Sequence, residues 1–322
     1  MKAIAQDRYG SADVLGLREV AEPPPLGPKD VLVGVRAAGV DRGVWHLMAG
    51  EPYAVRLGTG LRAPRQPVPG MDVAGVVTAV GADVSGFAAG DEVFGVGNGT
   101  FAEAAVVREG KLARKPATLS FAEAAAVPVS GVAALQAVRD QARVRAGQRV
   151  LVIGAGGGVG TFAVQIAKAS GAHVTGLCSA GKAEAVSALG ADEVLDYAQV
   201  DITDGTHRFD VVLDIAGNRP VRSLRRALEA RGTLVIVGGE GGGRWLGMSR
   251  QLGALLLSPF VRQRLRMFVS TVRSPDLLAL TELVDRGAVR PLIDRTYPLA
   301  EAPDAVRQLV AGTVTGKVVV TV

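Results

Sequence analysis

The chain has 322 residues, of which 48% are hydrophobic and 21% charged, a composition typical of folded globular proteins that excludes extensive disorder. The net charge of +5 is mild and dispersed, and aromatic residues make up only 4%, so we expect no specific nucleic-acid partner. The single cysteine, Cys178, excludes an internal disulfide and any zinc site of several cysteines, and it fits a cytoplasmic protein. This length predicts two domains, one of which is discontinuous.

The first part of the chain, to about Ala122, predicts a β-rich domain. Residues 31–35, 73–80 and 101–107 form extended, β-branched runs. Turns are predicted between them at 23–25, 89–91 and 95–99, where proline and glycine gather. The pattern is typical of a small irregular barrel or sandwich.

From Phe121 the pattern changes to alternating helices and strands. A helical stretch covers 121–141. Strands are then predicted at 149–153, 173–177, 194–197, 211–215 and 233–237, and helices at 159–170, 182–189 and 221–230. Such alternation predicts a parallel sheet that is covered by helices on both faces.

The last part predicts a helix at 246–257, a sixth strand at 265–269 and a helix at 275–286. A helix at 302–310 and a strand at 317–322 then resume the early pattern, so we expect them to rejoin the N-terminal domain. The predicted domains are 1–122, 123–270 and 271–322, the last completing the first. Uncharged runs at 150–167 and 251–261 are too glycine-rich or too short for a membrane span.

The most informative motif is VLVIGAGGGVGTFAVQIAK at 150–168, which is strand, glycine turn and helix in that order. Ala155, Gly157 and Gly160 nearly reproduce the glycine spacing of a dinucleotide site, with alanine in the first place. The backbone of Gly158 and Val159 opens the helix, whose N–H groups attract a pyrophosphate. Similar strand ends, where open parallel sheets bind ligands, carry four further candidate cofactor residues: Ala216, Gly217, Val237 and Gly238.

The end of the second strand indicates which dinucleotide is bound. NAD sites place an acidic residue there to hold the ribose diol, whereas residues 177–179 hold none. Lys182 follows closely, and Ser179 and Tyr197 supply hydroxyl groups. A cation and two hydroxyls suit a 2′-phosphate, so we expect NADPH.

With these segments in view, the chain resembles the medium-chain dehydrogenase/reductase superfamily, in its zinc-free quinone oxidoreductase branch. The resemblance covers nearly the whole chain. It is carried by AAGVDRGVWHLMAGEPY (37–53), PVPGMDVAGVVTAVG (67–81), GDEVFG (90–95), FAEAAAVPVSGVAAL (121–135), GAGGGVGTFAVQIAK (154–168) and TGKVVVTV (315–322). It implies an α/β protein: a Rossmann doubly wound parallel sheet plus a chaperonin-10-like catalytic domain built from both chain ends.

The same resemblance implies a metal-independent reaction. Zinc-dependent relatives have cysteine where this chain has Asp41, and Gly-His-Glu where it has Gly70-Met71-Asp72. The three histidines, at 46, 173 and 207, show no ligand spacing. Hydride transfer to a quinone or an activated C=C bond needs no Lewis acid, because the electron demand lies in the substrate.

The resemblance also indicates residues near the reaction. Asp41 stands where relatives usually have an asparagine that contacts the nicotinamide ribose; the alternative is a solvated loop carboxylate. Tyr53 is a candidate hydrogen-bond donor to a substrate carbonyl. Trp45 and His46 are candidate pocket residues, with domain packing and a polar rim as their alternatives. Lys317 is a candidate cofactor contact or a surface lysine.

These observations predict an NADPH-dependent, zinc-independent reductase of quinones or α,β-unsaturated carbonyl compounds. Two alternatives remain open: an enoyl reductase dedicated to a polyketide-type metabolite, and a nucleotide-binding interaction or RNA-binding protein with little turnover. Relatives pair through the edge of the nucleotide-domain sheet. The apolar stretch 245–260, with Leu252, Leu255, Leu256 and Leu257, therefore predicts a homodimer.

Overall fold

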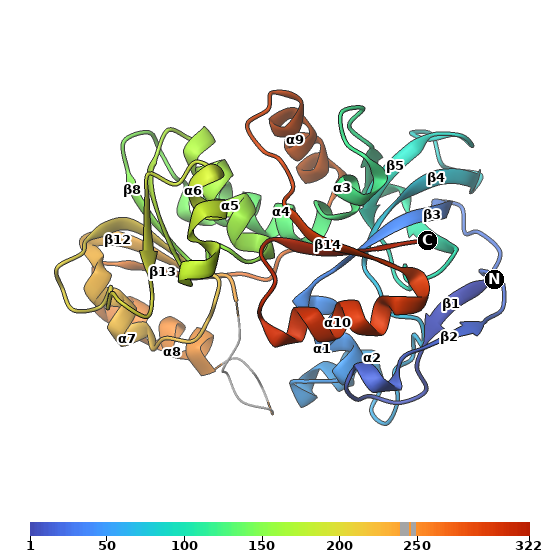
Figure 1. The fold of residues 1–322 in the computed structure, drawn as a ribbon, viewed down its shortest axis with the longest axis horizontal. Coiled ribbons are helices and arrows are strands. Elements are labelled where there is room, and N and C mark those ends of the chain that lie inside the picture. Colours follow the sequence, from blue (N-terminus) through green and yellow to red (C-terminus); the bar gives the residue numbers. More distant parts are fainter. Residues whose placement is uncertain (239–244, 246–248) are drawn as a thin grey trace. The chain divides into compact units, whose positions relative to one another are not determined.

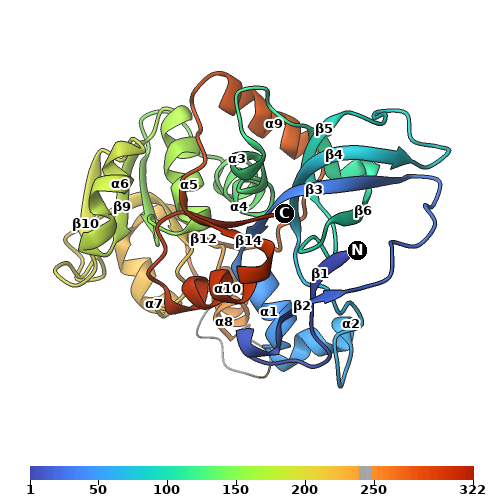
Figure 2. The ribbon, with the colours of Figure 1, turned by 45° about the vertical axis from the view of Figure 1, so that its right-hand side comes forward.

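The computed structural model describes residues 1–238, 245 and 249–322, which divide into two compact units (Figures 1 and 2). Unit 1 comprises 1–132, 272–287 and 291–322, and unit 2 comprises 133–271 and 288–290. The first division, at Val132/Ala133, lies later than the predicted 122/123, because α3 (Phe121–Ala125) contacts β3 (Asp30–Val40) and β4 (Asp72–Val80) of unit 1. Within the described residues, no helix has the length and apolar character needed to cross a bilayer.

Unit 1 is built from both ends of the chain, as expected. Its described strands form a sheet in the order β14-β15-β3-β4-β5-β7, with β6 also paired to β3, and a separate hairpin of β1 and β2. Antiparallel pairing of β15 with β3 joins the end of the chain to its beginning. The remaining strands are β1 (Lys2–Ala5), β2 (Gly16–Glu19), β5 (Glu92–Val96), β6 (Ala104–Arg108), β7 (Leu112–Arg114), β14 (Ile293–Pro298) and β15 (Lys317–Thr321).

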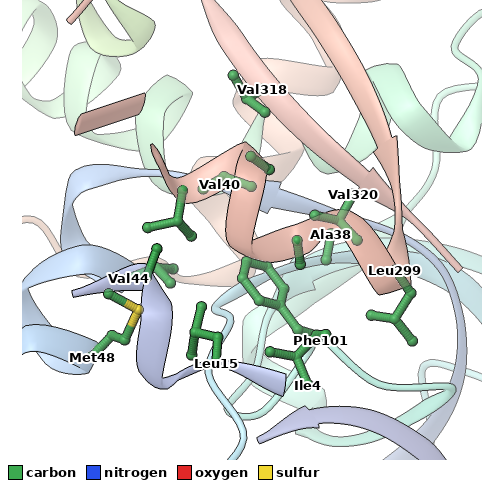
Figure 3. Close-up of a cluster of buried hydrophobic side chains, with 14 of the residues drawn as sticks. Ile4, Leu15, Ala38, Val40, Val44, Met48, Phe101, Leu299, Val318 and Val320 are labelled. Atoms are coloured by element: carbon green, nitrogen blue, oxygen red, sulfur yellow. The ribbon is translucent and has the colours of Figure 1, made fainter. Parts of the chain in front are cut away.

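The central strand β3 serves two apolar cores. Val31, Val33 and Val35 pack in one core, whereas Ala38 and Val40 pack in the other. The change from odd to even positions coincides with a register shift between Val35 and Ala37 in the β3–β4 pairing, since a bulge moves the following side chains to the opposite face. Figure 3 shows the second core, where side chains from residues 4–101 meet side chains from residues 299–320 near the end of the chain.

Two helices, α1 (Arg42–Ala49) and α10 (Ala302–Ala311), contact each other and supply side chains to the second core. Unit 1 also contains α2 (Arg56–Thr59) and α9 (Ser274–Asp285), and α9 contacts β7. The 3-10 turn Tyr53–Val55 connects α1 to α2. Packing of α1 on α10 fixes the first helix after β3, which carries several candidate site residues.

Unit 2 contains a parallel sheet in the order β10-β9-β8-β11-β12-β13. This is the strand order of a doubly wound dinucleotide-binding fold, with the order reversing between β8 and β11, and it confirms the predicted Rossmann sheet. The strands are β8 (Arg149–Ile153), β9 (His173–Cys178), β10 (Glu193–Asp196), β11 (Phe209–Asp214), β12 (Leu228–Ile236) and β13 (Arg264–Met267).

The helices of unit 2 lie on both faces of this sheet (Figures 1 and 2). On one face α7 and α8 pack against alternate residues such as Leu151 and Ile153, while α5 contacts β8 and β9 and α6 contacts β9 and β10. Their bounds are α5 (Gly158–Ala169), α6 (Ala183–Ala188), α7 (Val221–Leu224) and α8 (Ser249–Leu257).

Three sequence predictions of local structure were wrong. Residues 228–230 begin β12 rather than ending a helix, because Leu228 pairs with Phe209 of β11. Gly95 lies inside β5, not in a turn. The helix predicted over 121–141 is interrupted at Ala126 and resumes as α4 (Pro128–Leu135), then as a π-helical segment to Ala142. The first residues of the helix predicted at 246–257 lie outside the described residues.

Candidate functional site

The glycine turn after β8 has the close approaches that a dinucleotide site needs. Gly154 has φ +85°, and a Cβ atom added at Gly160 would lie 2.1 Å from the Gly154 carbonyl oxygen. Gly157 is the N-cap of α5, and no side chain caps its first N–H groups. These N–H groups fit a pyrophosphate, which Gly158 and Val159 would contact through the backbone.

Alanine in the first glycine place is accommodated by packing. Ala155 is fully buried, and its Cβ atom lies 3.2 Å from where a Cβ would stand at Gly176 of β9. The Ala155 N–H donates to the Leu177 carbonyl at 3.1 Å. The glycine in β9 therefore makes room for this alanine, and the turn keeps its shape.

The four other candidate cofactor residues at strand ends come together around Asp214. Ala216 contacts the glycine turn, because a Cβ at Gly154 would lie 3.1 Å from its backbone nitrogen. The Gly217 N–H donates to Asp214 Oδ1 at 3.2 Å, and the Val237 and Gly238 N–H groups donate to the Asp214 carbonyl at 3.0 and 3.2 Å. This group lies at the switch point of the sheet, where doubly wound folds bind ligands.

Sequence reasoning missed the partner of Asp214. The Arg250 guanidinium forms an ion pair with Asp214 Oδ2, and the Asp214 side chain is fully buried. Arg250 Nε also donates to the Arg219 carbonyl at 2.8 Å. A buried carboxylate needs a partner of this kind. The sequence contains no local pattern that would pair Asp214 with Arg250, because more than thirty residues separate them.

The residues expected to read the 2′-phosphate gather at the ends of β9 and β10. The stem of Lys182 packs over the glycine turn, since a Cβ at Gly156 would lie 2.8 Å from Lys182 Cδ. The Lys182 N–H donates to the Ser179 carbonyl at 2.9 Å, and the Tyr197 N–H donates to the Cys178 carbonyl at 3.1 Å. Ser179, Lys182 and Tyr197 thus lie at the neighbouring ends of β9 and β10, and their contact with a 2′-phosphate stays a prediction.

In unit 1, Asp41 is the N-cap of α1. Its Oδ1 accepts a hydrogen bond from the Val44 N–H at 3.1 Å, and the residue is 7% exposed. The solvated-loop alternative is therefore wrong. Its Oδ2 finds no hydrogen-bond partner within 1–238, 245 and 249–322, so it retains the capacity to accept one. Its contact with a nicotinamide ribose stays a prediction.

The neighbouring candidates have local partners. Trp45 packs against the second core, and its ring lies 4.8 Å from that of His46. The His46 Nδ1 atom is 2.7 Å from the Glu51 carbonyl oxygen. The Arg56 guanidinium stacks on the rings of Tyr53 and Tyr9, at 4.8 and 4.7 Å from their centroids. Their roles toward a substrate stay predictions.

A cavity of about 300 Å³ lies within unit 1, beside α1. Most of its lining residues are apolar, glycine or proline, and Thr59, Arg65 and three amides supply polar groups, which favours an apolar ligand that carries a few polar atoms. Trp45, His46 and Tyr53 are not among its lining residues, although α1 does form one wall. Sequence reasoning missed this lining, which includes Val44, Leu47, Met48, Val68, Pro69 and Met71 together with the amides Gln6, Gln66 and Asn98.

Lys317 lies in a buried polar cluster rather than on the surface. Its Nζ atom is 3.0 Å from Asp72 Oδ2 and 3.2 Å from Ser130 Oγ, and the side chain is 2% exposed. Asp72 Oδ1 also accepts the Val129 N–H at 2.8 Å. Burial raises the pKa of Asp72 to about 6, opposed by the Lys317 charge and reinforced by that of Asp41. Contact of Lys317 with a cofactor stays a prediction.

No group of three or more His, Cys, Asp or Glu side chains able to hold a metal ion occurs in the part of the chain that the structure describes.

Comparisons with known proteins agree with this geometry. Residues 27–117 match the family model described as the alcohol dehydrogenase GroES-like domain, and 189–320 match the one described as zinc-binding dehydrogenase. The chloroplast envelope quinone oxidoreductase homolog of Arabidopsis thaliana is 34% identical over 99% of this chain and 98% of its own length.

Two further similarities bear on the chemistry. The 2-methylene-furan-3-one reductase of Solanum lycopersicum is 33% identical over 99% of this chain and 79% of its own length. The crystal structure of the Escherichia coli quinone oxidoreductase complexed with NADPH is 25% identical, with a TM-score of 0.84 and full coverage of both chains.

The Lys317–Asp72 pair leads to a prediction about stability. Lys317→Met should lower the free energy of unfolding by about 3–5 kcal/mol, because it leaves a buried carboxylate unpaired. Lys317→Met combined with Asp72→Asn should cost less than the single change, since no charge is then stranded. Urea unfolding of the three proteins measures both values, and equal losses in the single and double variants would contradict the pairing.

The pH dependence supplies the control. A carboxyl whose pKa is about 6 when folded and near 3.8 when unfolded binds its proton more tightly in the folded state, so it stabilises most at low pH. Its contribution disappears as the pH rises through 6. The difference in unfolding free energy between wild type and the double variant should therefore grow as the pH falls from 7 to 4.

Proposed function

Because the chain belongs to the medium-chain dehydrogenase/reductase superfamily, among its quinone oxidoreductases, we propose that it is an NADPH-dependent reductase of quinones or α,β-unsaturated carbonyl compounds. Membership makes it an NAD(P)H-dependent oxidoreductase. The observation that carries the finer proposal is the position of Lys182, which packs over Gly156 of the glycine turn at the end of β9. A lysine at this strand end favours the cofactor that carries an extra phosphate.

Unit 2 supplies the parts of the proposed cofactor site that would hold the pyrophosphate and the 2′-phosphate. The N–H groups at the start of α5 would hold the pyrophosphate, and Lys182, Ser179 and Tyr197 would surround the 2′-phosphate. The strand ends around Asp214 would line the path toward the nicotinamide. Bound NADPH supplies the hydride, and the protein's part is to bind, orient and exclude water.

The cavity of unit 1 is the proposed substrate site. Its apolar lining suits a planar ring, and its amide side chains suit a carbonyl or hydroxyl group. Hydride addition to the β-carbon of an enone moves the C=C electron pair toward the carbonyl oxygen, and a proton from solvent or the pocket completes the reduction. The names of the two relatives, a quinone oxidoreductase homolog and a reductase of a methylene-ketone, support both substrate classes.

We also propose that two copies pair through the β13 edge of unit 2. Among the described strands, β13 ends the sheet and lacks a second neighbour. Leu255 and Leu256 of α8, which contacts β13, are 62% and 73% exposed, and Phe260 in the turn after α8 is 85% exposed. Trp245, earlier in the same predicted apolar stretch, is 76% exposed. Such a group of apolar side chains marks an interface more often than a monomer surface.

The proposed reaction gives the first functional prediction. The purified protein should consume NADPH with 1,4-benzoquinone or 9,10-phenanthrenequinone, and should keep this activity after dialysis against a chelator, because the chemistry needs no Lewis acid. The fall in absorbance at the NADPH band measures the activity before and after dialysis, and metal analysis measures the zinc content. NADPH binding without turnover of any quinone or enone would favour the interaction-protein alternative, and one tightly held zinc per chain would contradict the mechanism.

The position of Lys182 leads to a second functional prediction, which concerns cofactor binding. Lys182→Ala should weaken NADPH binding by about tenfold to a hundredfold, the worth of one charge-assisted contact, and leave NADH nearly unchanged. Lys182→Gln is the matched control, because it keeps a stem to pack over Gly156 while it removes the charge. If both variants lose NADPH and NADH affinity equally in calorimetry, Lys182 supports the fold rather than reads the phosphate.

The proposed dimer leads to a third prediction, which concerns the mass of the protein in solution. Light scattering should show the mass of two chains, and Leu255→Asp with Leu256→Asp should give the mass of one, because charges at a buried interface are costly. Leu278→Asp, at a 50% exposed position on α9 of unit 1, should leave the mass unchanged. A wild type of one-chain mass at micromolar concentration would contradict the proposal.

A further inference from the structure

An acidic residue lies one strand away from the place where NAD-binding proteins usually carry one. Strands β9 and β10 are parallel and end together, with Asp196 directly opposite Cys178 in the register. The next residue, Tyr197, donates its N–H to the Cys178 carbonyl. Asp196 therefore stands at the same edge of the sheet as Ser179 and Lys182, although it belongs to a different strand.

The turn after β10 fixes the carboxylate of Asp196. Its Oδ1 accepts the Ala198 N–H at 3.0 Å, and its carbonyl accepts the N–H groups of Gln199 and Val200 at 3.0 and 2.9 Å. These bonds close an Asx-type turn, a common way for aspartate to end a strand. The carboxylate is thus held at the strand end, half-buried, instead of moving freely in solvent.

Two opposite charges act on the same small region. Burial raises the pKa of the Cys178 thiol; the negative charge of Asp196 raises it further, and the positive charge of Lys182 lowers it. Asp196 and Lys182 both lie close enough to this sulfur to affect it. The site proposed for the 2′-phosphate therefore contains a cation that attracts the phosphate and an anion that repels it.

We propose that Asp196 is a specificity-determining residue that opposes the 2′-phosphate and so limits the preference for NADPH over NADH. The proposal rests on the cofactor site described above and names a residue that tunes it. Lys182 alone would give a strong preference. With Asp196 one strand away, the phosphate is attracted and repelled at once, and NADH, which has a neutral ribose diol, experiences neither effect.

The effect of one partly solvated charge is modest. Water screens such interactions, so removing the Asp196 charge should change phosphate binding by about threefold to tenfold rather than by several orders of magnitude. Asp196→Asn is the suitable change, because the asparagine Oδ1 still accepts the Ala198 N–H and the turn is kept.

The experiment measures binding by calorimetry with NADPH, NADH and two fragments that isolate this end of the cofactor, 2′,5′-ADP and 5′-AMP. Asp196→Asn should bind NADPH and 2′,5′-ADP about threefold to tenfold more tightly, and should bind NADH and 5′-AMP with less than about a twofold change. The gain should shrink at about 1 M salt, where the screening length falls to about 3 Å. It should persist in the Lys182→Ala background, because the repulsion acts on the phosphate directly.

Glu193→Gln is the matched control. It removes one negative charge from the same strand at its opposite end, where Glu193 accepts the Thr175 hydroxyl, and it should leave all four affinities unchanged. An equal gain in this variant would show a general charge effect and overturn the proposal. Weaker NADPH binding by Asp196→Asn would also overturn it, by showing that the carboxylate positions Lys182.

These outcomes are separate from those of the proposed reaction. A protein that reduces no quinone or enone can still be tested with the four ligands, so failure of the substrate proposal leaves this one standing. Conversely, unchanged affinities in Asp196→Asn would contradict the proposed role of Asp196. The proposal that the protein is an NADPH-dependent reductase would not be affected by that result.

Discussion

The buried pair of Lys317 and Asp72 is the interaction on which unit 1 depends. It joins residues 245 positions apart, one on the strand near the chain's end and one at the start of β4. Asp72 also holds the first turn of α4 through Val129, and Ser130 of the same turn accepts from Lys317. Three separate segments are therefore held by one carboxylate and one ammonium group, in a region where an unpaired charge is costly.

Asp41 adds a second carboxylate to the surroundings of this pair. Its charge acts on Asp72, and one of its oxygens caps α1, the helix that forms a wall of the cavity. An asparagine at this place would cap the helix equally well but add no charge. An aspartate at position 41 thus adds a negative charge to unit 1 while it provides the same helix cap.

Local signals made much of unit 2 predictable. The strand, turn and helix at 149–169 have apolar periodicity, glycines and length that agree with one another, so residues such as Gly157 and Gly160 were found from the sequence. Residues 228–230 were wrongly predicted as the end of a helix, because leucine, glutamate and alanine favour helices. They form a strand because Leu228 pairs with β11. Asp196 was missed for a related reason: its significance arises from the register between two strands. Lys317 was identified as a residue of interest, but its partner Asp72 could not be found, since nothing local records a contact over such a distance.

The division of the chain also bears on how the protein is made. Nearly all of unit 2 is synthesised before β14 and β15 exist, so it can fold on the ribosome while unit 1 still lacks two strands. Until β15 is made, residues 37–40 of β3 lack their partner strand and Asp72 lacks its ammonium partner, although residues 30–34 of β3 can still pair with β6. Chain order therefore allows nearly all of unit 2 to be made while unit 1 still lacks the strand that joins its two ends.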